Sequence, residues 1–208
     1  MSERPLPLRF APLALSAVTG ATLLWAQAYR GSADATPSPG DLGVFRHALH
    51  HGLGLSPPRQ ARSPVRIDPT GLELADVVLA SAAGNAYGHF SHATALMADG
   101  EVLGHNVLFG IFPMPLTDLE GYDHVRVLRA PLDAPRRREV ARFLRTLPGA
   151  VFQLGARKGD ARQWHCAKAV WAAFRRVGID LAPDRDFIVP DDIARSAALR
   201  VVRDWRSP

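Results

Sequence analysis

Apolar and polar residues follow each other along this chain in two kinds of pattern, one typical of strands and one typical of helices. The run LELADVVLASA (72–82) is apolar and rich in strand-forming residues, which predicts a buried strand. Two strand-like runs flank Asp99-Gly100 within residues 91–108, and this dipeptide is typical of a two-residue hairpin turn. HVRVLRAPL (124–132) and RVVRDW (200–205) predict two further strands.

Helical spacing is found in three segments of the C-terminal half. APRRREVARFLRTL (134–147) predicts an amphipathic helix with Pro135 in its first turn, and VPDDIARSAAL (189–199) predicts a short helix. RQWHCAKAVWAAFRRVG (162–178) predicts a helix that ends at Gly178. Strands mixed with segregated helices indicate the α+β class. The residues expected to face the core are Val140, Phe143, Leu144 and Leu147 in the first helix and Cys166, Ala169, Val170, Ala173, Phe174 and Val177 in the last. The residues expected to lie off the apolar stripe of the last helix are Lys168, Arg175 and Arg176.

The first thirty residues have the pattern of an export segment. Two arginines precede FAPLALSAVTGATLLWAQA (10–28), an uncharged run that ends in the small-x-small motif of a cleavage site. Residues 1–30 are therefore predicted to be a cleaved signal peptide or an uncleaved membrane anchor, because the run is also close to the length that spans a bilayer. Either interpretation places the rest of the chain outside the cytoplasm. A linker rich in Gly, Ser and Pro is expected over 31–64, and one folded domain over 65–208.

Composition and charge narrow the class of protein. The 208 residues are 47% hydrophobic and 22% charged, which suits one domain with an appendage. The net charge of +5 comes from scattered arginines, with no nucleic-acid motif, so we expect a solvated basic surface and no nucleic-acid partner. His47, His50 and His51 have helical spacing that a metal could use, but no further ligand is nearby, so neither a metal nor another cofactor is predicted.

The only cysteine, Cys166, lies at the N-terminal end of its predicted helix. A single thiol has no intramolecular disulfide partner, so in an oxidising compartment it is expected to be buried or used. The positive end of a helix favours the thiolate form. No Ser, Thr, Asp or Asn precedes the helix within residues 161–165, so its first backbone N–H groups are expected to be available to an oxyanion. The alternative is an inert cysteine on a core stripe.

A nucleophilic cysteine needs a base, and the predicted hairpin offers one. If Ala98 pairs with Glu101, the numbers of opposite residues sum to 199, which puts His92 and His105 on one face as diagonal neighbours about 7 Å apart at the backbone. One imidazole can then act as base and the other can orient it. The adjacent His165 is a poor candidate because neighbouring helical side chains do not face each other. His89 precedes the strand and is expected in a surface loop.

These motifs, in this order, resemble the circularly permuted branch of the NlpC-type papain-like hydrolases, the YiiX/YebB-like group. The resemblance covers roughly residues 70–202 and rests on the order and spacing of the motifs. It departs from the group at Ala75, where relatives have glycine, at Ala167 and Lys168 after the cysteine, and at His105, where many relatives have a carboxylate. The matching segments are LADVVLA, SHATAL, VLGHNVLFG, VRVLR, GAVF, WHCAKAV and VPDDIARS.

The resemblance implies a permuted papain-like fold in which an antiparallel sheet packs against the helix that carries the cysteine. It implies an acyl-enzyme mechanism with Cys166 as nucleophile, His92 as base and acid, and His105 as the residue that orients His92. An amide bond of the cell envelope, such as a peptidoglycan peptide, is the expected substrate. The alternatives are a Cys-dependent lipid acyltransferase or thioesterase, which would suit a membrane anchor over residues 10–28, and a non-catalytic module that binds the envelope.

Overall fold

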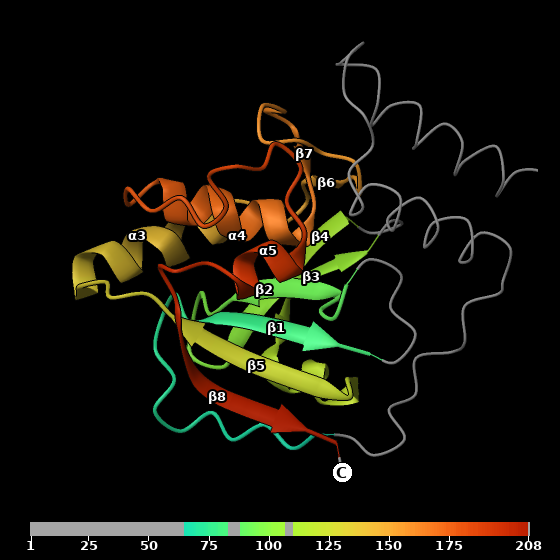
Figure 1. The fold of residues 1–208 in the computed structure, drawn as a ribbon, viewed down its shortest axis with the longest axis vertical. Helices are drawn as coiled ribbons and strands as arrows, with labels where there is room; N and C mark the ends of the chain where they lie inside the picture. Colours follow the sequence, from blue (N-terminus) through green and yellow to red (C-terminus); the bar gives the residue numbers. More distant parts are fainter. Residues whose placement is uncertain (1–64, 83–87, 107–109, 208) are drawn as a thin grey trace, which may run out of the picture.

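The central sheet is built from the predicted strands, all antiparallel, in the order β2-β1-β5-β8. The structure is a computed structural model that describes residues 65–82, 88–106 and 110–207, so the export segment, the linker and the histidines at 47, 50 and 51 lie outside the described residues. Figure 1 shows β1 and β5 side by side, with β8 at one edge. The strands are β1 (Val77–Ser81), β2 (His92–Ala95), β5 (His124–Arg129) and β8 (Arg200–Arg206).

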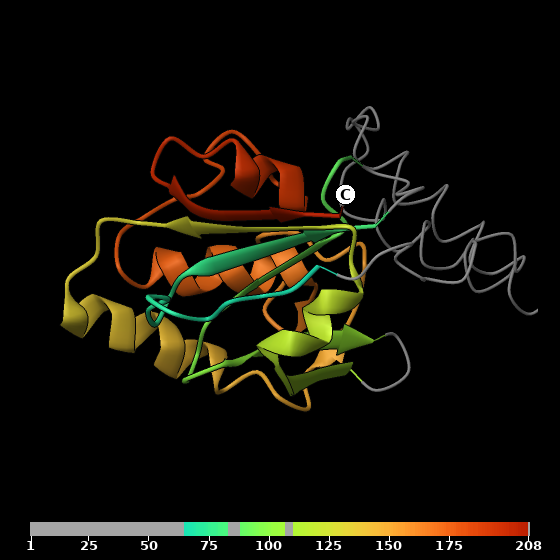
Figure 2. The same ribbon diagram turned by 90° about the horizontal axis from the view of Figure 1, so that it is seen from below.

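Strand β1 is buried over its whole length because both faces of the sheet are covered. Alternate residues of β1 therefore enter two separate cores. Val77 and Leu79 pack with the helices, whereas Val78 and Ala80 pack on the other face against η1 (Leu116–Gly121), a short 3-10 helix. Figure 2 gives the second view of this arrangement.

The turn of the predicted hairpin is present, but the ladder beyond it is not. Ala98 and Glu101 form the expected bridge. After this bridge β2 pairs with β1, whereas β3 (Glu101–Asn106) pairs with β4 (Gly110–Pro115). The physical reason is the turn type. Gly100 has a φ of 61°, but Ala75 is the one described residue other than glycine with a positive φ, so Asp99 has an ordinary negative φ. A turn of this kind does not match the twist of two paired strands, and the strands splay.

Three helices follow the strands. They are α3 (Ala134–Leu144), α4 (Cys166–Arg175) and α5 (Pro190–Ala194), and two short strands, β6 (Val151–Phe152) and β7 (Gln163–Trp164), pair in parallel before α4. Helix α4 packs on both β2 and α3, so the antiparallel sheet does pack against the helix that carries the cysteine. The predicted α+β class is confirmed, and the predicted inward stripes of α3 and α4 are buried apart from Phe143 and Val177, which are partly buried.

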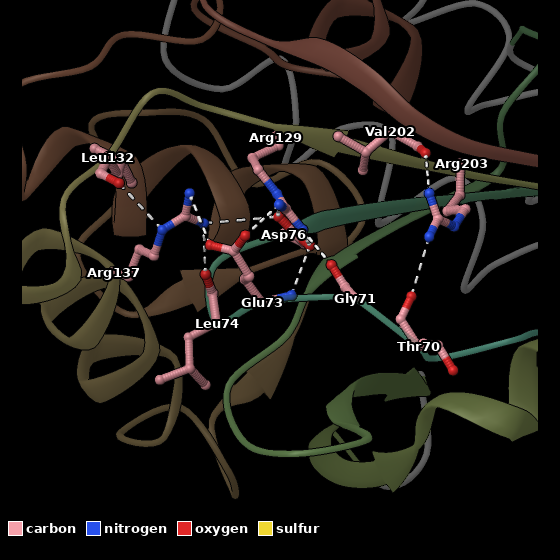
Figure 3. Close-up of polar contacts among 10 residues, drawn as sticks. All are labelled: Thr70, Gly71, Glu73, Leu74, Asp76, Arg129, Leu132, Arg137, Val202 and Arg203. Carbon is pink, nitrogen blue, oxygen red and sulfur yellow. Dashed lines mark hydrogen bonds and ion pairs between the residues drawn. The ribbon is translucent and has the colours of Figure 1, made fainter.

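At one end of the sheet a buried carboxylate is neutralised by two arginines (Figure 3). The Asp76 side chain is fully buried and receives Arg129 Nε at 2.7 Å and Nη2 at 2.6 Å. Arg137 lies 3.7 Å from the same carboxylate, and both arginines also pair with Glu73. The cluster holds the chain just after Ala75, whose φ of 67° explains why glycine would also suit that position.

In the part of the chain that the structure describes, no helix is long and apolar enough to cross a bilayer.

Candidate active site

Cys166 is the first residue of α4, and 6% of its surface is exposed. The expectation that this helix start is uncapped is wrong, because His165 caps it. Its Nδ1 accepts a hydrogen bond from the Lys168 backbone N–H at 3.3 Å, and its Nε2–H donates to the Ala156 carbonyl at 3.0 Å. Histidine is not among the usual capping residues, so the sequence pattern gave no sign of this bond.

The imidazole of His165 is committed to that structural role. The pKa of His165 is lowered from 6.5 to about 3; burial is the main cause, the bond to Ala156 opposes the shift, and the positive charge of Lys168 adds to it. The ring is therefore neutral at pH 7, and both of its nitrogens are bound within the protein. This geometry agrees with the expectation that His165 is a poor base for Cys166.

Lys168 is buried, contrary to the prediction that it lies off the core-facing stripe; 2% of its surface is exposed. Its ammonium group donates to the carbonyl of Gln163 at 2.8 Å and to that of Asp160, and it lies 5.0 Å from the Trp164 ring centre. Burial lowers the pKa of Lys168, and the nearby Asp160 raises it. The helical wheel was insufficient here because a long side chain can curl back to the carbonyls of the loop that precedes its own helix. Lys168 thereby holds the loop that leads to Cys166.

The structure brings His92 and His105 together, as the sequence predicted. Their ring centres are 5.3 Å apart, with 63° between the ring planes. His92 is the first residue of β2 and lies opposite Ala80, whereas His105 lies in β3 opposite Ile111. The two rings therefore meet although their strands do not form a ladder.

The contact between these rings is not a hydrogen bond. Both ring nitrogens of His105 are shielded from solvent, and neither has a hydrogen-bond partner within residues 65–82, 88–106 and 110–207. Burial lowers the pKa of His105 well below 6.5, and the neighbouring His92 and His165 lower it further. His105 is therefore neutral, and in this structure it contacts His92 edge to face. The expected orienting hydrogen bond is replaced by ring packing.

Two sets of contacts connect the histidine pair to the start of α4. The helix packs on β2 and on β3, the strands that carry the two rings. His105 also touches the Phe152 ring at 5.7 Å between centres, and Phe152 lies in β6, which pairs with the β7 strand that runs into His165 and Cys166. On the other side the Tyr122 ring stacks on His92 at 6.3 Å. His165, the residue that precedes Cys166, also acts electrostatically on His105.

A second group of polar residues at this end of the sheet was not predicted. His124 Nε2 lies 2.5 Å from Asp204 Oδ1, and His124 Nδ1 lies 2.6 Å from His89 Nε2. Burial lowers the pKa of His124, an effect that Asp204 opposes. A neutral His124 therefore donates to Asp204 and accepts from His89. His89 is exposed, as expected, but its ring is fixed by this chain of bonds. The three residues are far apart in sequence, so no local pattern could show their proximity.

Among the described residues there is no cluster of three or more potential ligands for a metal ion. Comparison of the chain with family models, with curated proteins and with solved structures found no match. The geometry of the described residues therefore carries the functional argument, together with the motifs of the sequence.

Proposed function

We propose that this protein is a thiol hydrolase that cleaves an amide bond through an acyl-enzyme on Cys166. The observation that carries the proposal is the placement of the only cysteine at the first position of a ten-residue helix that packs on the two strands bearing the touching rings of His92 and His105. A helix start favours a thiolate, and a neighbouring imidazole supplies the proton transfers that acyl transfer needs.

The proposed reaction has two steps. The Cys166 thiolate attacks the carbonyl carbon of the amide, and the C=O electron pair moves to oxygen while the new C–S bond forms. The C–N bond then breaks as the leaving amine takes a proton from the His92 imidazolium. In the second step His92 takes a proton from water and the resulting hydroxide attacks the thioester carbonyl. The C–S bond breaks and the carboxylic acid is released, which restores the Cys166 thiolate beside the His92 imidazolium. The Cys166 backbone N–H lies at the start of the helix and is the proposed oxyanion donor.

His105 is proposed to keep the His92 ring in place. Its own imidazole is neutral because of burial, so it places no second positive charge beside a His92 imidazolium. A neutral neighbour stabilises the imidazolium less than a carboxylate would. The role we propose for His105 is therefore orientation of the ring, with a smaller contribution to the rate than that of the nucleophile.

The proposed substrate is an amide of the cell envelope, such as a peptidoglycan peptide. The export pattern of residues 1–30 and the resemblance to NlpC-type hydrolases support this proposal. Both are independent of the site geometry. The basic net charge of +5 suits a location beside anionic envelope polymers.

The experiment is to incubate the protein with peptidoglycan fragments and to quench the reaction with acid. The masses of the intact chain and of the peptide that contains Cys166 are then measured by mass spectrometry. We expect an adduct with the mass of a peptide acyl group, absent from C166A. If lipid vesicles give a fatty acyl adduct and peptidoglycan fragments give none, the proposed amide substrate is wrong and the substrate is a lipid. The proposal is wrong if Cys166 forms no adduct with either substrate and is alkylated by iodoacetamide with an ordinary thiol pKa near 8.5.

The roles of the two histidines are tested by turnover. His105→Ala should lower kcat much less than Cys166→Ala or His92→Ala, because it removes packing and not a reacting group. Equal losses in the His105 and Cys166 variants would show that the assigned roles are wrong.

A further inference from the structure

The segment that precedes His92, residues 88–91, is held by a carboxylate from a distant part of the chain. Asp191 Oδ2 accepts a hydrogen bond from the His89 backbone N–H at 2.9 Å, and Oδ1 accepts one from the Phe90 N–H at 2.8 Å. Asp191 belongs to α5, about a hundred residues later in the chain. Both oxygens of one carboxylate therefore bind consecutive N–H groups of the segment that leads into β2.

Gly88 makes this approach possible. Its φ is +122°, a backbone conformation that residues with a side chain rarely adopt, and a Cβ at this position would lie 2.5 Å from Asp191 Oδ2. Phe90, two residues later, is 2% exposed and anchors the segment in the helix-side core. The carboxylate and the buried ring together restrict the movement of this part of the chain.

The rest of the segment is tied to the sheet. The His89 ring is bonded to His124 of β5, and the Ser91 backbone N–H donates to the Ala80 carbonyl of β1 at 2.9 Å. The next residue, His92, pairs with Ala80 in the sheet. Asp191 is therefore the point at which α5 fixes the position from which the His92 strand begins.

We propose that Asp191 is a positioning residue for the reaction, and that it sets the place of the His92 imidazole relative to Cys166 by holding the backbone at residues 89 and 90. This inference rests on the proposed function, because it assigns His92 as the group that exchanges protons with substrate. A shift of about 1 Å at a reacting group lowers a rate by about 10²-fold. The hydrogen bond from Asp191 to the Phe90 N–H lies two residues from His92. We therefore expect Asp191→Ala to lower kcat by about 10²-fold with little change in KM.

The neighbouring carboxylate supplies a matched control. Asp192 lies in the same short helix, and its side chain is more buried than that of Asp191, at 7% against 17% exposed. It binds the Val189 N–H at 2.9 Å and Arg195 at 2.8 Å and pairs with Arg185 at 3.4 Å, and none of these partners belongs to the segment before His92. Asp192→Ala should therefore reduce stability without moving His92.

The experiment measures the rate of iodoacetamide alkylation of Cys166 against pH in the full chain, with thermal unfolding of each variant in parallel. If His92 pairs with the Cys166 thiolate, His92→Ala raises the apparent thiol pKa towards about 8.5. Asp191→Ala should raise it in the same direction, and Asp192→Ala should leave it at the wild-type value. Asp191→Asn keeps one acceptor oxygen and should give an intermediate shift, which tests the proposal even if the alanine variant does not fold.

The possible outcomes separate the two proposals. If His92→Ala shifts the alkylation profile and both Asp191 variants match the wild type, the positioning role is refuted and the dyad stands. An equal shift in the Asp192 variant would reduce the effect to general loosening of α5, which also refutes the role. If His92→Ala itself leaves the profile unchanged, the proposed function fails, whatever the Asp191 variants do.

Discussion

His165 should make the stability of this protein depend steeply on pH below 7. The ring is buried and neutral, with Nδ1 capping α4 and Nε2–H bound to the Ala156 carbonyl. Burial is the main reason that its pKa falls from 6.5 to about 3. As the pH falls through 6.5, the unfolded chain takes up a proton on this ring and the folded chain does not. The contribution to stability is therefore complete above pH 6.5 and is lost progressively as the pH falls towards 3.

The size of the effect follows from the shift. At pH 5 the pH is about 1.5 units below the pKa of the imidazole in the unfolded chain, and each unit corresponds to about 1.4 kcal/mol. Protonation of His165 alone should therefore reduce the free energy of unfolding by about 2 kcal/mol between pH 7 and pH 5. The pKa values of His105 and His124 are also lowered, chiefly by burial, so the wild type should lose more than this amount. A variant without the His165 ring isolates its share.

The assay is urea unfolding of the full chain at pH 7 and pH 5, followed by tryptophan fluorescence and linear extrapolation. The variant is His165→Asn, because asparagine is a favourable N-cap and does not titrate. Its unfolding free energy at pH 7 should be lower than that of the wild type, since the bond to Ala156 is lost. Its further decrease between pH 7 and pH 5 should be smaller than that of the wild type by about 2 kcal/mol. If both proteins lose the same amount to within about 0.5 kcal/mol, the buried neutral ring is refuted.

Two further predictions concern stability at pH 7, measured in the same urea assay. Arg129→Ala should reduce the unfolding free energy by about 3–5 kcal/mol because the fully buried Asp76 loses its main partner. As a control, Arg142→Ala should change it by about 0.5 kcal/mol or less, because the Arg142 side chain is 73% exposed. Equal losses would contradict the assigned role of the buried pair. Gly88→Ala should be more destabilising than Gly178→Ala by at least about 1 kcal/mol. Both glycines have a positive φ, but only Gly88 has a carboxylate oxygen where its Cβ would lie. Similar losses of unfolding free energy in the two variants would show that the close approach of that carboxylate is unimportant.

The main elements of the fold could be predicted from periodicity because burial imposes it. Strand β1 is apolar at every position since both faces of the sheet are covered, and the predicted stripe of α4 is buried from Cys166 to Phe174. Strand pairing could not be predicted in the same way. Which strand lies beside β2 depends on contacts between distant segments, and the single local cue, Asp99-Gly100, gave the turn but not the twist that follows it.

The candidate site was predictable where it depends on side-chain spacing and unpredictable where it depends on unusual partners. The cap on α4 is an imidazole, and the buried cation beside it is Lys168, neither of which fits the preferences that sequence interpretation uses. The sequence placed Asp191 only within the short helix predicted over 189–199, since its partners at residues 89 and 90 lie about a hundred positions away. Bonds from side chains to a distant backbone leave no periodic signal.

The histidine pair shows why a wrong ladder still gave the right contact. The predicted register put His92 and His105 on one face because the alternation of side chains depends only on the parity of the positions along each strand. Strand β2 keeps that parity through its pairing with β1, and β3 keeps it through its pairing with β4. Near the turn the two strands are still joined, because the Leu103 N–H donates to the hydroxyl oxygen of Thr94 at 3.0 Å, where a ladder would use a carbonyl. The two rings are therefore carried by separate sheets that this side-chain bond and the turn hold together, and their edge-to-face contact follows from that separation.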